Sequence, residues 1–275
     1  MRVAILTVRP LDPREFGGAE RLYDAMVEGF RAAGHDAHEI DVPVDESCFE
    51  GIQQGYVSFR ELELSGFDLV ISTKAPSWLV RHTHHVCWQV HTMRVFYDMF
   101  EDVFPDPSSE QFAQRSAIRE IDTLALSWPN CRKVFAIGEE VAMRLEASSG
   151  LVAEVMHPPL WSDAFSCQAF GDYFFLPGRL HPWKRVDLAI EAFRRTRGAV
   201  RLLIAGTGEA EGALKAAASG DRRIEFLGRV DDAQLAGLYS NCIAVPFMPL
   251  REDYGYVTLE AFASGKPVIT CGDSG

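Results

Sequence analysis

The stretch Tyr173–Gly206, YFFLPGRLHPWKRVDLAIEAFRRTRGAVRLLIAG, decides the fold class. It opens with a short apolar run that predicts a buried strand. A helical pattern follows from Val186, and a second apolar run ends at Gly206. Apolar strands joined by a helix predict neighbouring parallel strands in an α/β sheet that is covered on both faces. Ligands of such sheets bind beyond the carboxyl ends of the strands.

The same alternation runs through the rest of the chain. Further strands are expected at 3–8, 35–42, 67–73, 84–91, 133–138, 153–159, 224–228, 243–247 and 267–271. A Pro-bearing segment near residues 158–165 separates two such patterns, which predicts domains at 1–162 and 163–275. No helical pattern follows the last strand, so we expect the second domain to be incomplete.

Composition indicates a soluble globular protein, with 47% hydrophobic and 24% charged residues. The net charge is −12, and residues 1–160 carry 14 Lys and Arg against 25 Asp and Glu. This acidic surface argues against nucleic acid as a partner and against broad docking on an anionic membrane, while a peripheral membrane contact stays open. No signal peptide or membrane span is evident. The six cysteines show no CxxC spacing, so we expect a cytoplasmic protein.

Two motifs in the first half invite a ligand. EFGGAE (15–20) joins a strand to a helix, and its glycines allow backbone amides to approach a phosphate; a plain turn explains it equally well. HTHHVCWQVH (82–91) places His85, Cys87, Gln89 and His91 on one side of a strand. Adjacent residues of one extended strand rarely converge on a metal, so no metal site is expected. His91, at the strand end, is the better site candidate.

The second half offers cations and carboxylates at strand ends. Arg179 and Lys184 follow a strand and suit a diphosphate, although surface cations are the plain alternative. IAGTGEAEG (204–212) departs from the dinucleotide pattern GxGxxG, because its third glycine comes one residue late; a strand-to-helix turn explains it better.

The stretch REDYGYVTLEAF (251–262) combines both themes. Gly255 precedes a helix whose first amides, on Tyr256, Val257 and Thr258, can hold a diphosphate. Glu252 and Glu260 flank that position, where each carboxylate can accept hydrogen bonds from vicinal hydroxyls of a sugar or ribose. Solvated glutamates near a helix start are the alternative, and the pattern alone leaves both open.

These residues resemble the retaining GT-B glycosyltransferases of family four (glycosyl transferases group 1). Glu252 and Glu260 match that family's E-x7-E motif. FGGAERL, VHTMR, GRLHPWKRVDLAIEAF, IEFLGRV and EAFASGKPVI resemble its other signature segments, in its order. The resemblance implies two Rossmann-like domains whose parallel sheets face a cleft. The first domain takes the acceptor and the second, here truncated, holds a nucleotide sugar.

Roles follow from the resemblance by position. It implies that Gly17 and Gly18 approach the donor diphosphate, which Arg179 and Lys184 neutralise and the backbone of Gly255–Thr258 cradles. It places Glu260 on the ribose hydroxyls, Glu252 on the transferred sugar, and His91 at the reacting centre. Arg229 and Val230 would line the base. HTMRVFYDMFED (91–102) is similar to a segment of mannosyltransferases in the family, without its proline.

The implied activity is retaining transfer of a hexose from a UDP- or GDP-linked donor to a hydroxyl acceptor, such as a glycan, a lipid-linked sugar or a small molecule. No cofactor or metal is expected, since no D-x-D motif ends a strand. Two other hypotheses stay open: a truncated, transferase-like module that binds nucleotide without catalysis, and an NAD-dependent oxidoreductase, which the late glycine near Gly206 disfavours.

Overall fold

The computed structural model describes residues 1–9 and 17–274. The chain forms two compact units, Met1–Pro159 and Leu160–Gly275, whereas the sequence-based expectation puts the division after residue 162. Each unit contains parallel strands joined by helices, in the α/β arrangement that the alternating pattern predicts.

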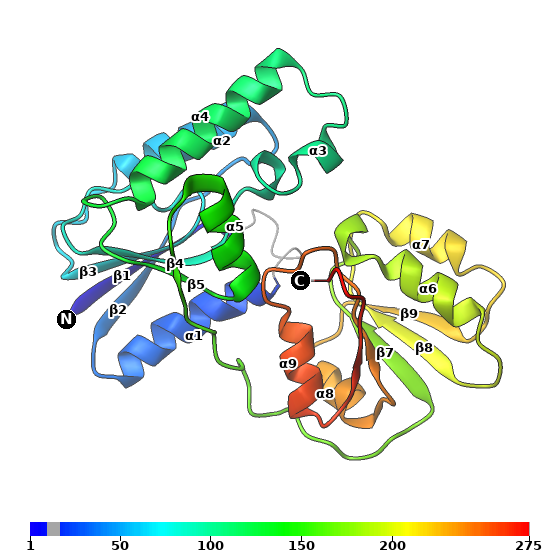
Figure 1. Ribbon diagram of the computed structural model, residues 1–275. Coiled ribbons are helices and arrows are strands. Elements are labelled where there is room, and N and C mark those ends of the chain that lie inside the picture. Colours follow the sequence, from blue (N-terminus) through cyan, green and yellow to red (C-terminus); the bar gives the residue numbers. More distant parts are fainter. Residues whose placement is uncertain (10–16, 275) are drawn as a thin grey trace. The chain divides into compact units, whose positions relative to one another are not determined.

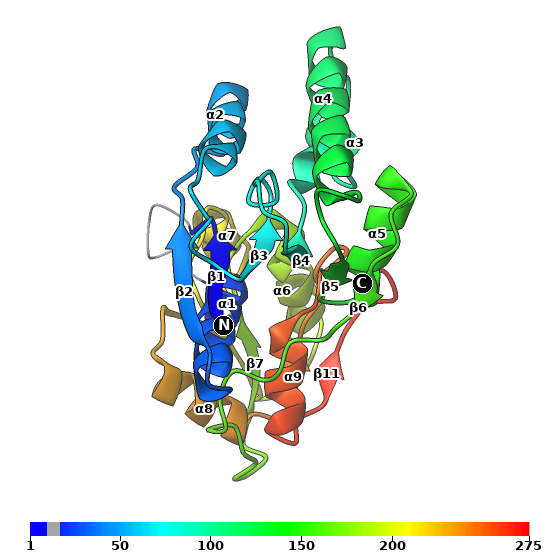
Figure 2. The same ribbon diagram turned by 90° about the vertical axis from the view of Figure 1, so that its left-hand side faces the viewer.

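The first unit is built on a six-stranded parallel sheet in the order β2-β1-β3-β4-β5-β6. Its strands are β1 (Arg2–Thr7), β2 (Asp36–Asp41), β3 (Leu69–Lys74), β4 (His85–His91), β5 (Val134–Ala136) and β6 (Glu154–Val155). Its helices are α1 (Gly18–Ala32), α2 (Phe49–Arg60), α3 (Phe100–Val103), α4 (Ser109–Leu126) and α5 (Glu139–Ser149), with the short 3-10 turn η2 (Arg94–Phe96). Helix α1 lies on one face of the sheet, and α2 and α4 lie on the other (Figures 1 and 2).

Burial explains the central strands of this sheet. Residues Val3 to Leu6 of β1 are fully buried, and the strand pairs with β2 on one side and β3 on the other. Helix α1 is amphipathic, and it buries Leu22 and Met26 in the first unit. Each such side chain contributes roughly 1.5–3 kcal/mol by leaving water.

The first histidine of strand β4, His85, lies in the core of the first unit. His85 is fully buried, and its ring nitrogens lie 2.8 Å from Ser72 Oγ and 3.0 Å from Asn130 O. Burial lowers the pKa of His85 to about 4, which keeps the imidazole neutral near pH 7. His85 is therefore a hydrogen-bonded core residue.

The second unit contains parallel strands in the order β7-β8-β9, and a separate pair, β10-β11. Its strands are β7 (Tyr173–Pro177), β8 (Arg201–Ala205), β9 (Ile224–Gly228), β10 (Val245–Pro246) and β11 (Val268–Ile269). Its helices are α6 (Val186–Arg194), α7 (Glu211–Ala217), α8 (Asp232–Asn241) and α9 (Tyr256–Ala263), with the 3-10 turn η3 (Pro182–Lys184). The strands expected at 243–247 and 267–271 are thus shorter than predicted. Two backbone hydrogen bonds join the segment before β10 to β7. They run from Ile243 N to Tyr173 O (2.8 Å) and from Phe175 N to Ala244 O (3.1 Å).

Alternating side chains of β7 and β8 point into two cores. Leu176, Leu202 and Ile204 pack with residues of α6 and α7, whereas Phe175 and Leu203 pack with residues of α8 and α9. Helices α6 and α7 lie on one face of these strands, and α8 and α9 lie on the other (Figure 1). The period of two along each strand produces this division. Both faces of the sheet are buried, so its carboxyl edge is where polar side chains gather.

A buried carboxylate organises the helical part of the first unit. Asp122 of α4 accepts hydrogen bonds from the hydroxyls of Tyr56 and Tyr97 and from the indole of Trp78. Asp122 is 2% exposed, and burial raises its pKa to about 6 against the opposing effect of these donors. The carboxyl group therefore connects α4 to α2, to Tyr97 just after η2, and to the segment after β3.

Replacing Asp122 by asparagine is expected to remove a pH dependence of stability. The folded-state pKa of about 6 lies above the ordinary value of 3.8. The contribution of Asp122 to the unfolding free energy of the wild type is thus complete below about pH 4 and is lost as the pH rises through about pH 6. The unfolding free energy of the wild type, relative to that of Asp122→Asn, should fall by about 3 kcal/mol over this window. Urea denaturation across the window measures it, with the exposed Asp106→Asn as control. A difference that stays constant with pH would contradict the account.

Candidate functional site

The carboxyl edge of the second unit's sheet collects most of the predicted ligand-binding residues. Arg179 and Lys184 follow β7, while Arg229 and Val230 follow β9, and Glu252 lies between β10 and α9. Arg179 and Arg229 are exposed and Val230 is half-buried. The parallel strand directions bring these loops to one edge, as the sequence predicts for a ligand site.

Lys184 and Glu252 form the central ion pair of this edge. Lys184 Nζ lies 2.6 Å from Glu252 Oε2, and the two side chains are 32% and 20% exposed. The Lys184 ammonium also lies 5.9 Å from the centre of the Phe247 ring. A partly exposed pair adds less than about 1 kcal/mol to stability, so its position beside a helix start is the more informative feature. The pair joins a cation and a carboxylate that come from different strand ends.

Arg185 fixes the loop that carries Glu252, a role that the sequence analysis missed. Its guanidinium donates to the carbonyls of Met248 (2.7 Å) and Pro249 (3.0 Å) and to the carboxylate of Asp273 (2.7 and 2.9 Å). This hydrogen bonding lowers the pKa of Asp273. The Arg185 backbone is left-handed, with φ of 49°. Such a conformation costs about 1 kcal/mol in a non-glycine residue, which the side-chain contacts offset.

Glycine and alanine at position 185 should separate the side chain from the backbone. Glycine adopts the left-handed backbone without strain, so Arg185→Gly loses only the hydrogen bonds of the guanidinium to Met248, Pro249 and Asp273, here called the clamp. The unfolding free energy should therefore fall by about 2 kcal/mol. Arg185→Ala should lose about 1 kcal/mol more, because alanine keeps the backbone cost. Urea unfolding of both variants measures the two steps. Wild-type stability in Arg185→Gly would show that the clamp contributes nothing.

The start of α9 depends on Gly255. Its φ is 76°, and a Cβ there would lie 2.9 Å from Phe247 Cε1, so both conformation and space require glycine. The Thr258 amide already donates to Gly255 O at 2.9 Å. Three first-turn amides are predicted from the sequence to face a ligand. Because the Thr258 amide has this partner, the prediction is limited to the amides of Tyr256 and Val257.

Glu260 lies one turn further into α9 and is 6% exposed. Its Oε1 accepts a hydrogen bond from the Trp161 indole at 2.6 Å, and its Oε2 accepts one from the Tyr239 hydroxyl at 2.7 Å. Neither donor could be predicted from the sequence pattern. Trp161 lies in the segment interpreted as a domain boundary, and Tyr239 lies on a helix among apolar residues that look like core.

The glycines of IAGTG allow two loops of this edge to touch. A Cβ at Gly206 would lie 1.9 Å from Gly178 O, and a Cβ at Gly208 would lie 2.4 Å from Leu180 O. Leu180 N donates to Thr207 O at 2.9 Å. These glycines therefore support the loop that carries Arg179, and the segment forms the turn from β8 to α7.

Three predicted residues belong to the first unit. Gly17 and Gly18 stand at the start of α1, after β1, and His91 is the last residue of β4. The Gly17 amide donates to the Glu20 carboxylate at 2.6 Å. His91 Nδ1 lies 2.8 Å from Thr92 O. Residues 15 and 16 of the same glycine-bearing loop lie outside the described residues.

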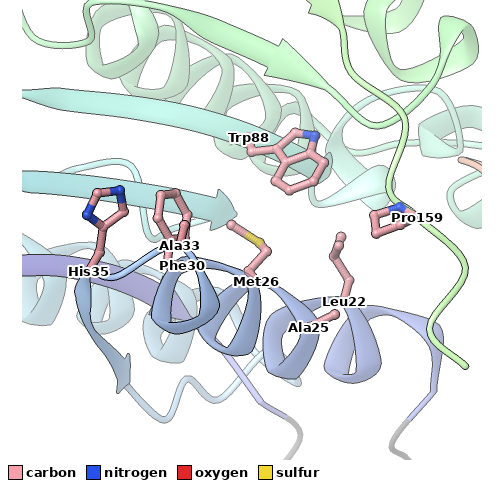
Figure 3. Close-up of a pocket in the computed structure, with 9 residues that line it drawn as sticks. Leu22, Ala25, Met26, Phe30, Ala33, His35, Trp88 and Pro159 are labelled. Atoms are coloured by element: carbon pink, nitrogen blue, oxygen red, sulfur yellow. The ribbon is translucent and has the colours of Figure 1, made fainter.

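The first unit also contains an apolar pocket of about 300 Å³ between α1 and β4. Leu22, Met26 and Phe30 of α1 point toward Trp88 and Pro159 (Figure 3). The Trp88 indole donates to Met156 O at 2.9 Å and so already has an acceptor. With this lining the pocket does not suit a charged nucleotide sugar.

Every helix among residues 1–9 and 17–274 is too short or too polar to span a lipid bilayer. Over the same residues, no group of three His, Cys, Asp or Glu side chains is arranged to hold a metal ion.

Comparison with solved structures defines the fold class. HepE of Anabaena, solved with UDP and glucose, superimposes with a TM-score of 0.70 at 14% identity, over 100% of this chain and 82% of that one. Sucrose-phosphate synthase of Thermosynechococcus elongatus gives a TM-score of 0.73 at 18% identity, over 100% and 82%. At these identities the likeness shows the fold alone, which is the GT-B fold of glycosyltransferases.

Sequence comparison adds a narrower match in the second unit. Residues 171–275 match the family model of glycosyl transferases group 1. A D-rhamnosyltransferase of Pseudomonas aeruginosa, WbpZ, is 35% identical over 100 residues, which are 36% of this chain and 26% of that relative. The match therefore spans about a quarter of the curated relative. The matched family segment includes Lys184, Glu252 and Glu260.

Proposed function

We propose that this chain is a glycosyltransferase that moves a sugar from a nucleoside-diphosphate sugar to a hydroxyl acceptor. The observation that carries the proposal is the Lys184–Glu252 pair, 2.6 Å apart beside the start of α9. A cation and helix-terminal amides suit a diphosphate, and a neighbouring carboxylate suits the hydroxyls of a sugar. The family match over residues 171–275 supports the same assignment.

The proposed chemistry breaks the bond between the anomeric carbon and the diphosphate. Negative charge then develops on the leaving diphosphate. Lys184, Arg179 and the amides of Tyr256 and Val257 stabilise this charge in place, which lowers the barrier. The acceptor hydroxyl forms the new bond on the same face, and its proton passes to the departing phosphate. This course retains the anomeric configuration and uses no metal ion.

The remaining assignments follow the family resemblance. Glu252 exchanges its contact with Lys184 for hydroxyls of the transferred sugar, and Glu260 takes the ribose. Arg229 and Val230 line the base. Gly17 and Gly18 contact the diphosphate and His91 contacts the sugar. We include UDP- and GDP-linked hexoses as donors, with a mannosyltransferase-like activity among the candidates, and a cytoplasmic location.

A donor screen tests the proposal. Wild-type protein is incubated with UDP-, GDP- and ADP-linked glucose, mannose and rhamnose, with and without EDTA, and release of nucleoside diphosphate is measured. Release from one donor, unchanged by EDTA, is expected, and NMR of the product should show a retained anomer. Binding without release in the presence of an acceptor panel favours the alternative, a nucleotide-binding module. Absence of both overturns the proposal.

A further inference from the structure

We propose that Trp161 is a positioning residue that orients the Glu260 carboxylate toward the ribose hydroxyls of the donor. This inference rests on the proposed function, because it assigns a residue to the nucleotide side of the same site. Trp161 belongs to no helix or strand and lies 99 residues before Glu260 in the chain. Its indole N–H nevertheless donates a hydrogen bond to the Glu260 carboxylate, with Nε1 2.6 Å from Oε1.

The hydrogen bonds that Trp161 and Tyr239 donate to Glu260 differ in their surroundings. The bond from Tyr239 to Oε2 is buried, and Tyr239 itself is fully buried. The bond from Trp161 to Oε1 is only partly buried. Tyr239 thus anchors the carboxylate on its inner side, while Trp161 holds the side that a ligand can reach. A carboxylate oxygen has the capacity to accept two hydrogen bonds, so a diol that binds Glu260 need not displace the indole.

Aromatic packing fixes the position of the indole. The rings of Trp161 and Phe165 meet edge to face, with centroids 5.2 Å apart, and Phe165 meets Tyr239 at 5.6 Å. The two donors to Glu260 are therefore connected through one intervening ring. Because both carboxylate oxygens are fixed, their outward lone pairs point in defined directions, which suits a vicinal diol better than a single hydroxyl.

The expected consequence is discrimination between ribose and dideoxyribose. Isothermal titration calorimetry with UDP, GDP and ADP identifies the nucleoside diphosphate that binds. Its 2′,3′-dideoxy counterpart is then titrated, and the two dissociation constants are compared. Wild-type protein should prefer the ribose form by about tenfold or more. Trp161→Phe keeps a ring and loses the N–H, so it should lower this preference by about fivefold. Trp161→His restores a ring N–H and should retain more of the preference than Trp161→Phe.

Trp128→Phe is the matched control, since it makes the same change at an exposed tryptophan of the first unit. It should leave the preference unchanged. The inference is overturned if Trp161→Phe prefers the ribose form over the dideoxy form as strongly as the wild type does. It is also overturned if the substitution weakens binding of both forms equally, which indicates general damage to the site. Equal values for the Phe and His variants also overturn it, as does a wild type that binds both forms alike. If the wild type binds none of the three diphosphates, the proposed function itself fails.

Discussion

Replacing Lys184 by alanine is expected to lower the turnover of the donor by about 100- to 1,000-fold. Lys184 lies 2.6 Å from Glu252 and beside the start of α9, where the diphosphate would gather charge as its bond to the sugar breaks. The substitution removes the ammonium that stabilises this charge. It should also weaken binding of the free nucleoside diphosphate by about 10- to 100-fold. Steady-state release of nucleoside diphosphate and isothermal titration give the two values.

Lys215→Ala is the control for this prediction. Lys215 is paired with Glu211 on α7 at 2.6 Å, so its loss removes the same charge from another ion pair of the second unit. Turnover should stay within about twofold of the wild type. If Lys184→Ala retains wild-type affinity and turnover, Lys184 does not touch the diphosphate and the proposed site is misplaced.

Replacing Glu252 by glutamine should separate binding from catalysis. The glutamine keeps the size of the side chain and removes the charge that competes with a diphosphate for Lys184. Affinity for the free nucleoside diphosphate should therefore rise by about two- to fivefold. Turnover of the sugar donor should fall by about 100-fold, because the carboxylate no longer accepts the sugar hydroxyls as a charged partner.

The same two assays measure this prediction, and Glu225→Gln on β9 provides a matched loss of charge at an exposed glutamate. A parallel loss of affinity and turnover in Glu252→Gln would show that Glu252 supports the fold of the loop. An unchanged turnover would remove Glu252 from the reaction. Opposite signs in the two assays are specific to a carboxylate that pairs with Lys184 before the donor binds.

The βα alternation could be predicted from sequence because each strand buries both faces. The run YFFLPG becomes β7, and its side chains alternate between two cores. Helix α2, by contrast, was not expected. Its sequence contains Gly51 and Gly55, which lower helix propensity. A Cβ at these positions would lie 2.4 Å from Asp45 O and 2.7 Å from Val44 Cγ1. The helix therefore packs closely against the segment that precedes it, which requires these glycines, and helix propensity does not contain that information.

The candidate site shows the same limit. Lys184 and Glu252 could be placed near each other because the sequence predicts that both follow strands of one parallel sheet. In the structure β7 and β10 belong to two sheets, which backbone hydrogen bonds join just before β10. The partners of the Trp161 indole and of the Arg185 guanidinium could not be predicted, since the packing of irregular segments brings them together and no strand pattern indicates it. Trp161 contacts Glu260 across 99 residues and Arg185 contacts Asp273 across 88. Contacts of this kind follow from the folded arrangement of loops, which have no periodicity to reveal them.

Hydrogen–deuterium exchange with a bound nucleoside diphosphate tests the central claim most directly. UDP, GDP and ADP are added in turn, and amide protection is mapped along the chain. We predict that the diphosphate that binds protects peptides covering residues 179–185 and 252–260 and the start of α1 at Gly17 and Gly18, while the apolar pocket along residues 22–33 exchanges as before. Protection confined to residues 22–33, or saturable binding that leaves residues 252–260 unprotected, would contradict the account.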